Sequence, residues 1–205
     1  MRQQSTVADI VAAGGEAIAV KADLALAEDR QGLVDSAKDA YGAIDILVNN
    51  TQGPIAGDVN SVSINDYQNA FDLLFKNIVL TSTLALKNMK KNEWGRIINM
   101  ASVSVKEPLR YLALSNTIRS ALTTWGKTLS NEVAKSNITV NNILTGYFNT
   151  ERLEQLNSEK AIKMGVKVEE VFDAMKNQVP AKRIGNPKEF GYLATFLSSD
   201  YASYI

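Results

Sequence analysis

Two serines and an arginine have side chains that could carry out chemistry on a bound ligand. Ser102 closely follows an apolar run that includes Ile97 and Ile98, and Ser115 and Arg119 stand one helical turn apart further along the chain. Small and polar residues at the carboxyl end of a buried strand are where open α/β sheets place their ligands. Hydroxyl and guanidinium groups can bind and orient a polar ligand. They are poorly suited to proton transfer, because arginine stays protonated and an aliphatic hydroxyl is a far weaker acid than a phenol, whose pKa is about 10.

Composition excludes several other kinds of site. The chain contains no Cys and no His, so disulfides, Cys/His metal sites, thiol nucleophiles and Ser-His-Asp triads are ruled out, and we expect no metal. The 22 basic residues balance the 22 acidic ones, which gives no electrostatic reason to expect nucleic acid as a partner. No apolar run approaches the roughly 18 residues that a membrane span needs, so no membrane is expected. The first residues lead into a polar helix rather than a secretory signal, which favours a cytoplasmic protein.

Alternating strands and helices must position the two serines and the arginine. Short apolar runs predict strands over 17–20, 44–48, 97–101 and 137–144. Apolar residues at helical spacing predict helices over 6–13, 27–41, 65–91, 115–134 and from 187 onward, where Asn186, Pro187 and Glu189 form a capping-box pattern. Strands that alternate with helices indicate an α/β fold with a doubly wound parallel sheet.

Residues 95–132 resemble the active-site strand and helix of the short-chain dehydrogenase/reductase (SDR) superfamily, and in particular 3-oxoacyl-(acyl carrier protein) reductases. In that family a Ser follows the strand and a Tyr-x-x-x-Lys pair opens the next helix. Ser102 matches the Ser, whereas Ser115 and Arg119 stand in the places of the Tyr and the Lys. The resemblance implies NAD(P)-dependent hydride transfer between carbonyl and hydroxyl groups of a small molecule, with these three residues in the catalytic positions. Arg119 would also reach the ribose of the cofactor, and Tyr111 on the preceding loop is an alternative phenol.

The same resemblance implies residues that bind the cofactor NAD or NADP. Asp23 and Leu24 occupy the place of an Asp-hydrophobic pair that touches the adenine ring, although Asp23 could equally just end a strand. Gly146 and Thr150 keep the spacing of a Gly and a Thr whose hydroxyl meets the nicotinamide-side phosphate. The positions that determine whether a family member prefers NAD or NADP are not among those that the resemblance matches.

The family segment Asn-Asn-Ala-Gly, which stabilises the central strand and lines the cofactor pocket, corresponds to Asn49, Asn50 and Gly53, with an altered turn between them. Strand-end hydrogen bonding alone is the alternative role for the two amides. The family's proton-relay Asn falls at Leu74, and Asn77, one turn later, could replace it only in a shifted register.

The resemblance covers essentially all 205 residues, but only the middle and later part of a family domain. No G-x-G-x-x-G motif, nor the looser G-x-x-x-G-x-G, occurs in the sequence. We therefore expect one partial Rossmann-like domain over 1–205, an incomplete sheet whose first two strands and last strand are absent from the chain, and a substrate lid over 151–180. The strand at 44–48 would present an open apolar edge. The strand at 17–20 would be unpaired or would pair directly beside it.

Three functional hypotheses follow. The first is an SDR oxidoreductase with a degenerate catalytic site that acts on a small-molecule carbonyl substrate. The second is a non-catalytic relative that serves as a binding or assembly subunit, and the third is a truncated fragment of a longer product without function of its own. For the oxidoreductase and for the non-catalytic subunit alike, we expect a homo-oligomer. It would form through helices 65–91 and 115–134, which correspond to the family's dimer bundle.

Overall fold

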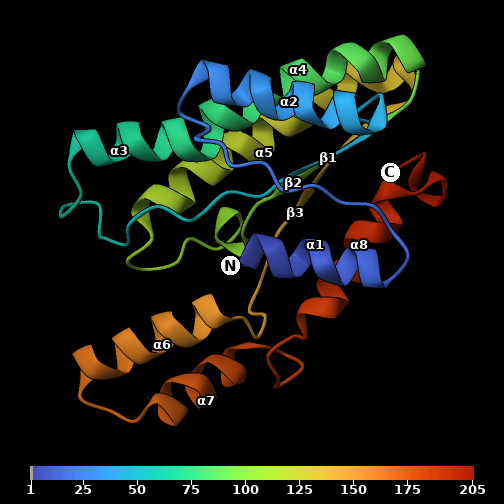
Figure 1. Cartoon of the computed structure of the whole chain (residues 1–205). Helices are drawn as coiled ribbons and strands as arrows, with labels where there is room; N and C mark the ends of the chain where they lie inside the picture. The colour runs from blue at the N-terminus through green and yellow to red at the C-terminus, as the bar shows by residue number, and fades with distance from the viewer. Residues whose placement is uncertain (1) are drawn as a thin grey trace.

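A three-stranded parallel sheet lies at the centre of the computed structural model, which describes residues 2–205, with the side chains from residue 5 onward (Figure 1). The strands are β1 (Ile46–Asn49), β2 (Gly95–Met100) and β3 (Ile138–Ile143), in the order β1-β2-β3. Each neighbouring pair runs parallel. The predicted α/β fold is therefore confirmed.

Helices cover both faces of this sheet, as a doubly wound fold requires. On one face α4 (Asn77–Asn92) and α5 (Ala113–Val133) pack against the strands, and α2 (Ala27–Tyr41) lies on α4. On the other face α8 (Pro187–Ser198) packs against β2 (Figure 1). The remaining α-helices are α1 (Arg2–Ala12), α3 (Ile64–Phe71), α6 (Glu151–Met164) and α7 (Val168–Gln178).

Apolar side chains fill both interfaces of the sheet. Between the sheet and helices α4 and α5 lies a cluster formed by Ala85, Leu86, Met89, Ile97, Val133, Ile138 and Val140. On the α8 side the cluster consists of Ile98, Ile143, Leu197 and Ala202. Ile97 and Ile98 point to opposite faces, since successive residues of a strand alternate, and both are almost fully buried. The near-continuous apolar run of β2 is thus explained by burial on both sides.

The predicted strand at 17–20 is wrong: these residues form an irregular segment, and they do not pair beside β1 either. Ile18 is 48% exposed there. A strand depends on a hydrogen-bonded neighbour, and among the described residues no strand lies next to this segment. The predicted open apolar edge is present on β1, where Ile46 and Val48 are 43% and 47% exposed.

A fully buried arginine, Arg96, stands inside the apolar strand β2. Its guanidinium donates hydrogen bonds to the carbonyls of Asn137 (3.1 Å) and Ser199 (3.3 Å) and lies 4.3 Å from the ring centroid of Trp94. Asp200, 3.5 Å away, is its carboxylate partner. Burial lowers the pKa of Arg96, and Asp200 partly offsets this effect. Arg96 therefore ties the amino end of the sheet to the chain that follows α8.

Three asparagines, of which Asn49 and Asn99 are buried and Asn142 is half-buried, form a hydrogen-bonded ladder across the sheet. Asn49 pairs with Asn99 and Asn99 pairs with Asn142 in the strand register. The Nδ2 group of Asn49 donates to Asn99 Oδ1 (2.9 Å), and that of Asn99 donates to Asn142 Oδ1 (3.0 Å). The ends are closed by helices: Asn49 also donates to Ser82 Oγ on α4 (3.0 Å), and Asn142 donates to the Thr123 carbonyl on α5 (3.2 Å). We refer to Asn49, Asn99 and Asn142 as the asparagine ladder.

Gly126 on α5 makes room for the asparagine ladder. A Cβ atom at this position would lie 2.7 Å from Asn142 Oδ1 and 3.0 Å from Asn99 Nδ2. Both distances are too short for side chains that are fixed by their own hydrogen bonds. A glycine in the middle of a helix normally costs about 1 kcal/mol relative to alanine. Close approach of α5 to the ladder accounts for that cost.

We predict that Gly126→Ala lowers the free energy of unfolding by about 1–3 kcal/mol, because overpacking outweighs the gain in helix propensity. Gly32, an exposed position inside α2, is the matched control, since a Cβ there would meet nothing within 4 Å. Gly32→Ala should raise the free energy of unfolding by about 0.5–1 kcal/mol. Urea denaturation followed by circular dichroism measures both. A Gly126→Ala protein as stable as the wild type would contradict the proposed contact.

Candidate functional site

The candidate site lies at the carboxyl edge of the sheet, where the chain leaves β2 and enters α5. A short 3₁₀ turn (Val103–Val105) follows β2 directly, and it packs against α5. The segments after β1 and β3 leave the same edge, because the strands are parallel. This is the edge at which doubly wound sheets bind their ligands.

Arg119 joins α5 to the end of β2. Its Nη1 group donates a short hydrogen bond to the carbonyl of Met100, the last residue of the strand. The residue is half-buried, and burial lowers the pKa of its guanidinium. Ser115 precedes it by one helical turn, so both residues lie on the side of α5 that faces this edge. The structure thus brings Arg119 of α5 next to the end of β2, as predicted from the sequence.

The hydroxyl groups of Ser102 and Ser115 are both free to donate a hydrogen bond to a ligand. Ser102 caps the 3₁₀ turn, and its Oγ atom accepts a hydrogen bond from the Ser104 backbone N–H (3.1 Å). A hydroxyl that accepts in this way can still donate its own proton. Ser115 lies in the first turn of α5, and within residues 2–205 no hydrogen bond to its hydroxyl is found.

Tyr111, the alternative phenol, lies at the surface with 66% of the residue exposed. Its backbone has a left-handed conformation (φ 61°), and its carbonyl accepts a hydrogen bond from the Gly57 N–H (2.8 Å). The Gly57 carbonyl in turn accepts from Ala113 (3.1 Å). The loop is therefore held in a position that exposes the phenol.

The two candidate relay positions on the preceding helix serve other purposes. Leu74 is fully buried, and it packs with Leu114 and Ile118 in the core. It lies in a π-helical turn (Asp72–Lys76), a feature that is frequent at functional sites. Asn77 is also buried, and its Oδ1 atom accepts a hydrogen bond from Arg30 Nη1 (3.4 Å). Its amide therefore helps to hold α2 against α4.

The predicted cofactor-binding positions near the sheet fall into two groups. Asn49 is buried in the asparagine ladder, so its amide stabilises the strands. Asn50, Gly53 and Gly146 are exposed at the carboxyl edge. Thr150 is the N-cap of α6, and its hydroxyl oxygen accepts from the Leu153 N–H (3.2 Å). Its hydroxyl proton can still be donated to a ligand.

Asp23 and Leu24 form a turn in front of α2. The Asp23 carboxylate accepts a hydrogen bond from the Ala25 N–H (2.9 Å), and the Asp23 N–H donates to Asp29 (2.6 Å). The Leu24 carbonyl accepts a hydrogen bond from buried Arg30. These contacts give both residues a structural role in this chain, whatever they contact in addition.

Unpartnered buried polar atoms show whether this edge fits a polar ligand. Thr51 Oγ1, Ser104 Oγ and Asn116 Oδ1 are buried and make no hydrogen bond. They come from the segments after β1 and β2 and from the first turns of α5, all of which are close to the carboxyl edge. Buried polar groups are nearly always satisfied in proteins, so these three atoms are available to a polar partner. Two other unpartnered buried atoms, Thr81 Oγ1 on α4 and Thr139 Oγ1 on β3, lie outside this site. The residues of the site fit the ribose and nicotinamide end of a dinucleotide, whereas the sequence holds no Gly-rich turn for its pyrophosphate.

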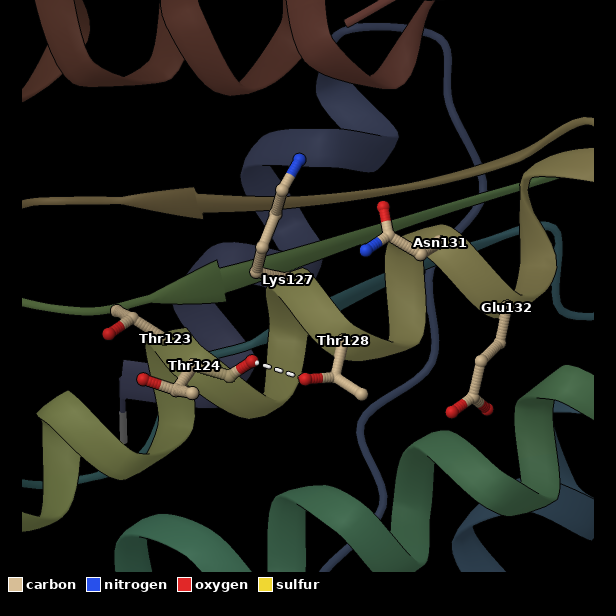
Figure 2. A pocket seen from close by; sticks show the side chains of 6 residues that line it. All are labelled: Thr123, Thr124, Lys127, Thr128, Asn131 and Glu132. Carbon is tan, nitrogen blue, oxygen red and sulfur yellow. Dashed lines mark hydrogen bonds between the residues drawn. The ribbon is translucent and has the colours of Figure 1, made fainter.

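Two hollows differ in their relation to this site. One, of about 210 Å³, is lined by Gly53, Pro54, Ile55, Asp66, Asn69, Ala70, Leu73 and Leu114. It touches the Gly53 loop and the residue before Ser115. The other, of about 450 Å³, is larger and open, and Figure 2 shows that Thr123, Thr124, Lys127, Thr128, Asn131 and Glu132 of α5 line it. None of the candidate residues lines the larger hollow, whereas Gly53 lines the smaller one, so the smaller hollow is the one next to the candidate site.

The segment predicted as a lid forms a hairpin of two helices that stands apart from the sheet (Figure 1). Helices α6 and α7 pack against each other, with Ala161 and Val171 buried between them. A backbone bridge between Phe148 and Gly185 closes the base of the hairpin. A Cβ at Gly185 would lie 2.7 Å from the Phe148 ring, so this close approach needs a glycine.

The fold and the polar carboxyl edge define a Rossmann-like α/β protein. A family model described as enoyl-(acyl carrier protein) reductase matches residues 1–205. The NADPH-dependent reductase BacG of Bacillus subtilis is 30% identical over 204 residues, which cover 98% of this chain and 79% of the relative. A 3-oxoacyl-[acyl-carrier-protein] reductase of Synechocystis sp. is 30% identical over 97% of this chain and 75% of the relative.

Solved structures agree with the sequence relatives. The crystal structure of YwfH, an NADPH dependent reductase involved in bacilysin biosynthesis, superposes with a TM-score of 0.92 at 29% identity and covers 98% of this chain and 79% of that one. An NAD⁺-bound xylitol dehydrogenase gives a TM-score of 0.90 at 25% identity, covering 98% of this chain and 80% of that one. The chain belongs to the short-chain dehydrogenase/reductase family.

Two further classes of feature are missing from the described part of the chain. None of its helices combines the length and the apolar character that crossing a bilayer requires. Among the same residues, no group of three or more acidic side chains is placed so that it could hold a metal ion.

An exposed ion pair fastens the chain that follows the lid segment to α8. Arg183 donates two hydrogen bonds to the Glu189 carboxylate (2.7 and 2.6 Å), and the same carboxylate accepts from the Asn186 N–H. Arg183 first, and then the Asn186 N–H, lower the pKa of Glu189 from 4.5 to about 2. Because the folded-state pKa is depressed, the charged carboxylate stabilises the fold above pH 4.5, and this stabilisation is lost as the pH falls towards 2.

We predict that Glu189→Gln makes the stability less dependent on pH between about pH 4.5 and pH 2. Glu132→Gln, at an exposed position of α5 where no ion pair is found among the described residues, is the control and should keep the wild-type slope. Urea midpoints measured across this range test the difference. Equal slopes for Glu189→Gln and the wild type would refute the role of the pair.

Proposed function

We propose that the chain acts as an NAD(P)-dependent oxidoreductase of the SDR family on a carbonyl or hydroxyl group of a small molecule, with a degenerate catalytic site. One observation carries the proposal: Arg119 binds the carbonyl of Met100 and so fixes the start of α5 beside Ser102. Ser115 lies on the same turn of the helix. The relatives named NADPH-dependent reductases support NADP or NAD as the cofactor.

Each side chain would have a limited task in such a reaction. The bound cofactor supplies the hydride. Ser102 can donate its hydroxyl hydrogen to a carbonyl oxygen, and Arg119 can donate N–H groups to ribose hydroxyls. Ser115 stands where a phenol would protonate the carbonyl oxygen, and its hydroxyl is poorly matched to that step. Substrate binding is therefore retained, while proton transfer is slow.

Binding of the cofactor would use exposed residues at the carboxyl edge. Gly53 and Gly146 leave room for close approach, since neither would bring a Cβ within 3.4 Å of another group. The Asn50 amide and the Thr150 hydroxyl can hydrogen-bond to ribose or phosphate oxygens. Asp23 and Leu24 would contact the adenine, in addition to their part in the turn before α2. Helices α6 and α7, at 151–180, would cover the substrate as a lid.

A non-catalytic subunit is the second candidate function. Three positions that carry out proton transfer in the family hold Leu74, Ser115 and Arg119, and Leu74 is part of the core. A homo-oligomer formed through 65–91 and 115–134 would suit such a role, and Phe71 and Leu80 on this side are 38% and 37% exposed. A truncated fragment without activity would show neither assembly nor cofactor binding.

The first test measures cofactor binding. NADPH and NADH are titrated separately against the purified chain, and the fluorescence of the reduced cofactor is followed. We expect saturable binding that is weakened about tenfold or more by Arg119→Ala, since at least one hydrogen bond from a charged donor is lost. Arg110→Ala, at an exposed loop position, is the control and should bind as the wild type does. If the wild-type chain bound neither cofactor, the proposed oxidoreductase function would be rejected and the role as a non-catalytic subunit would be favoured.

A second test restores the missing acid. Ser115→Tyr combined with Arg119→Lys returns a phenol and an amine at helical spacing. We expect carbonyl reduction with NADPH, measured over a panel of aldehydes and ketones, to rise by about 10²-fold or more. The matched control, Ser115→Phe with Arg119→Lys, has the same ring without the hydroxyl and should not gain activity. A gain in both double variants, or in neither, would argue against a defect in proton transfer.

A further inference from the structure

We propose that Arg119 forms the centre of an oxyanion site, which takes a carboxylate or phosphate group of the ligand at the carboxyl edge of the sheet. This inference deepens the proposed function, because Arg119 belongs to the same site. It names the charge that the ligand must carry.

The charge on Arg119 has no acidic partner in the part of the chain that the structure describes. By contrast, the buried guanidinium of Arg96 faces the Asp200 carboxylate at 3.5 Å. For Arg119, burial alone lowers the pKa, with no carboxylate to offset it. A cation that is taken partly out of water without a counter-charge destabilises the fold. A bound anion would remove this penalty.

The donors of the guanidinium are also largely unused. The group carries five N–H bonds in a planar fork, and the one hydrogen bond found for it within residues 2–205 runs to the Met100 carbonyl. The remaining donors match the two oxygens of a carboxylate or phosphate. Neutral ribose hydroxyls could accept these hydrogen bonds, but they would leave the charge uncompensated.

The surroundings of Arg119 add further groups that favour an anion. The first turn of α5, a helix of 21 residues, contains no acidic residue, and Leu112 at its N-cap makes no side-chain hydrogen bond. The positive end of the helix dipole therefore remains unneutralised. The hydroxyls of Ser102 and Ser115 can both donate. Ser104 is 1% exposed, and its hydroxyl has no partner, on a turn that packs against α5.

Two sources could supply such a group. A carboxylate would belong to an acidic carbonyl or hydroxy substrate, whereas a phosphate would belong to the cofactor or to a phosphorylated substrate. Both meet Arg119 through the same pair of oxygens. Small anions can therefore serve as probes for the shared chemistry and also distinguish its source.

The test titrates sodium acetate, phosphate and pyrophosphate into the ¹⁵N-labelled chain at constant ionic strength, with chloride as the balancing anion. The side-chain Nε–H signal of Arg119 is assigned by its loss in Arg119→Lys, a variant that keeps the charge and the fold. We expect this signal to shift saturably. We also expect the anion to raise the unfolding temperature of the wild type, because ligands that bind the folded state stabilise it.

Arg119→Gln should weaken the binding at least tenfold, while Arg110→Gln, at an exposed loop position, should leave it unchanged. Saturation by acetate would assign the site to a carboxylate, and saturation by phosphate or pyrophosphate alone would assign it to a phosphate. A wild-type Arg119 signal that does not move, or equal binding by Arg119→Gln, would overturn the proposal. The anion titrations contain no NADPH, so they test the oxyanion site independently of the cofactor. If anions bind here while the separate cofactor titration shows no NADPH binding, the proposed oxidoreductase function is rejected and the oxyanion site stands.

Discussion

The asparagine ladder is the interaction on which the arrangement of the sheet depends. Asn49, Asn99 and Asn142 lie side by side in three parallel strands, and each amide binds the next. A buried amide without a partner costs about 1–3 kcal/mol, so a shift of one strand by one residue would strand several such groups at once. Apolar side chains alone tolerate rearrangement far better. The ladder therefore sets the register of the strands, and Gly126 lets α5 come close enough to close it.

The register in turn positions the candidate site. Because Asn99 is fixed in the ladder, the position of Met100 at the end of β2 is fixed as well. Ser102 lies two residues beyond the strand, so its position at the carboxyl edge is also defined. Arg119 then attaches α5 to the Met100 carbonyl. Arg119 stands where the family has a lysine, and it keeps a long cationic side chain that can reach the end of the strand. A lysine has a pKa that can be tuned, whereas an arginine stays charged, so this position is better suited to the anion binding that we propose than to proton transfer.

Local signals in the sequence predicted local structure well. The helix at 27–41 and the capping box of Asn186 with Glu189 are found as predicted, since both depend on residues within a few positions of one another. The sites of Ser102, Ser115 and Arg119 relative to the strand and helix also followed from sequence spacing. The strand at 17–20 failed, because an apolar run becomes a strand only beside a partner.

Features that join distant segments were not visible in the sequence. Arg96 interrupts an apolar run, and two of its hydrogen-bond partners, the carbonyls of Asn137 and Ser199, lie 41 and 103 positions away, so its full burial could not be inferred. Asn99 and Asn142 looked like ordinary strand residues until the register placed Asn99 between Asn49 and Asn142. The double role of Thr150, as N-cap and as a candidate ligand, likewise depends on where α6 begins.

Two unmet requirements remain in the described structure, and they differ in kind. Along β1 the backbone edge has no neighbouring strand among the described residues and Ile46 and Val48 are exposed, a deficit that a further strand or a covering segment would satisfy. At Arg119 the deficit is one of charge and of a few hydrogen bonds, which a small anion can satisfy. The first concerns the stability of the sheet, while the second concerns a ligand. Because Arg119 is held by the end of β2, which the ladder fixes, the anion site does not depend on how the edge of β1 is covered.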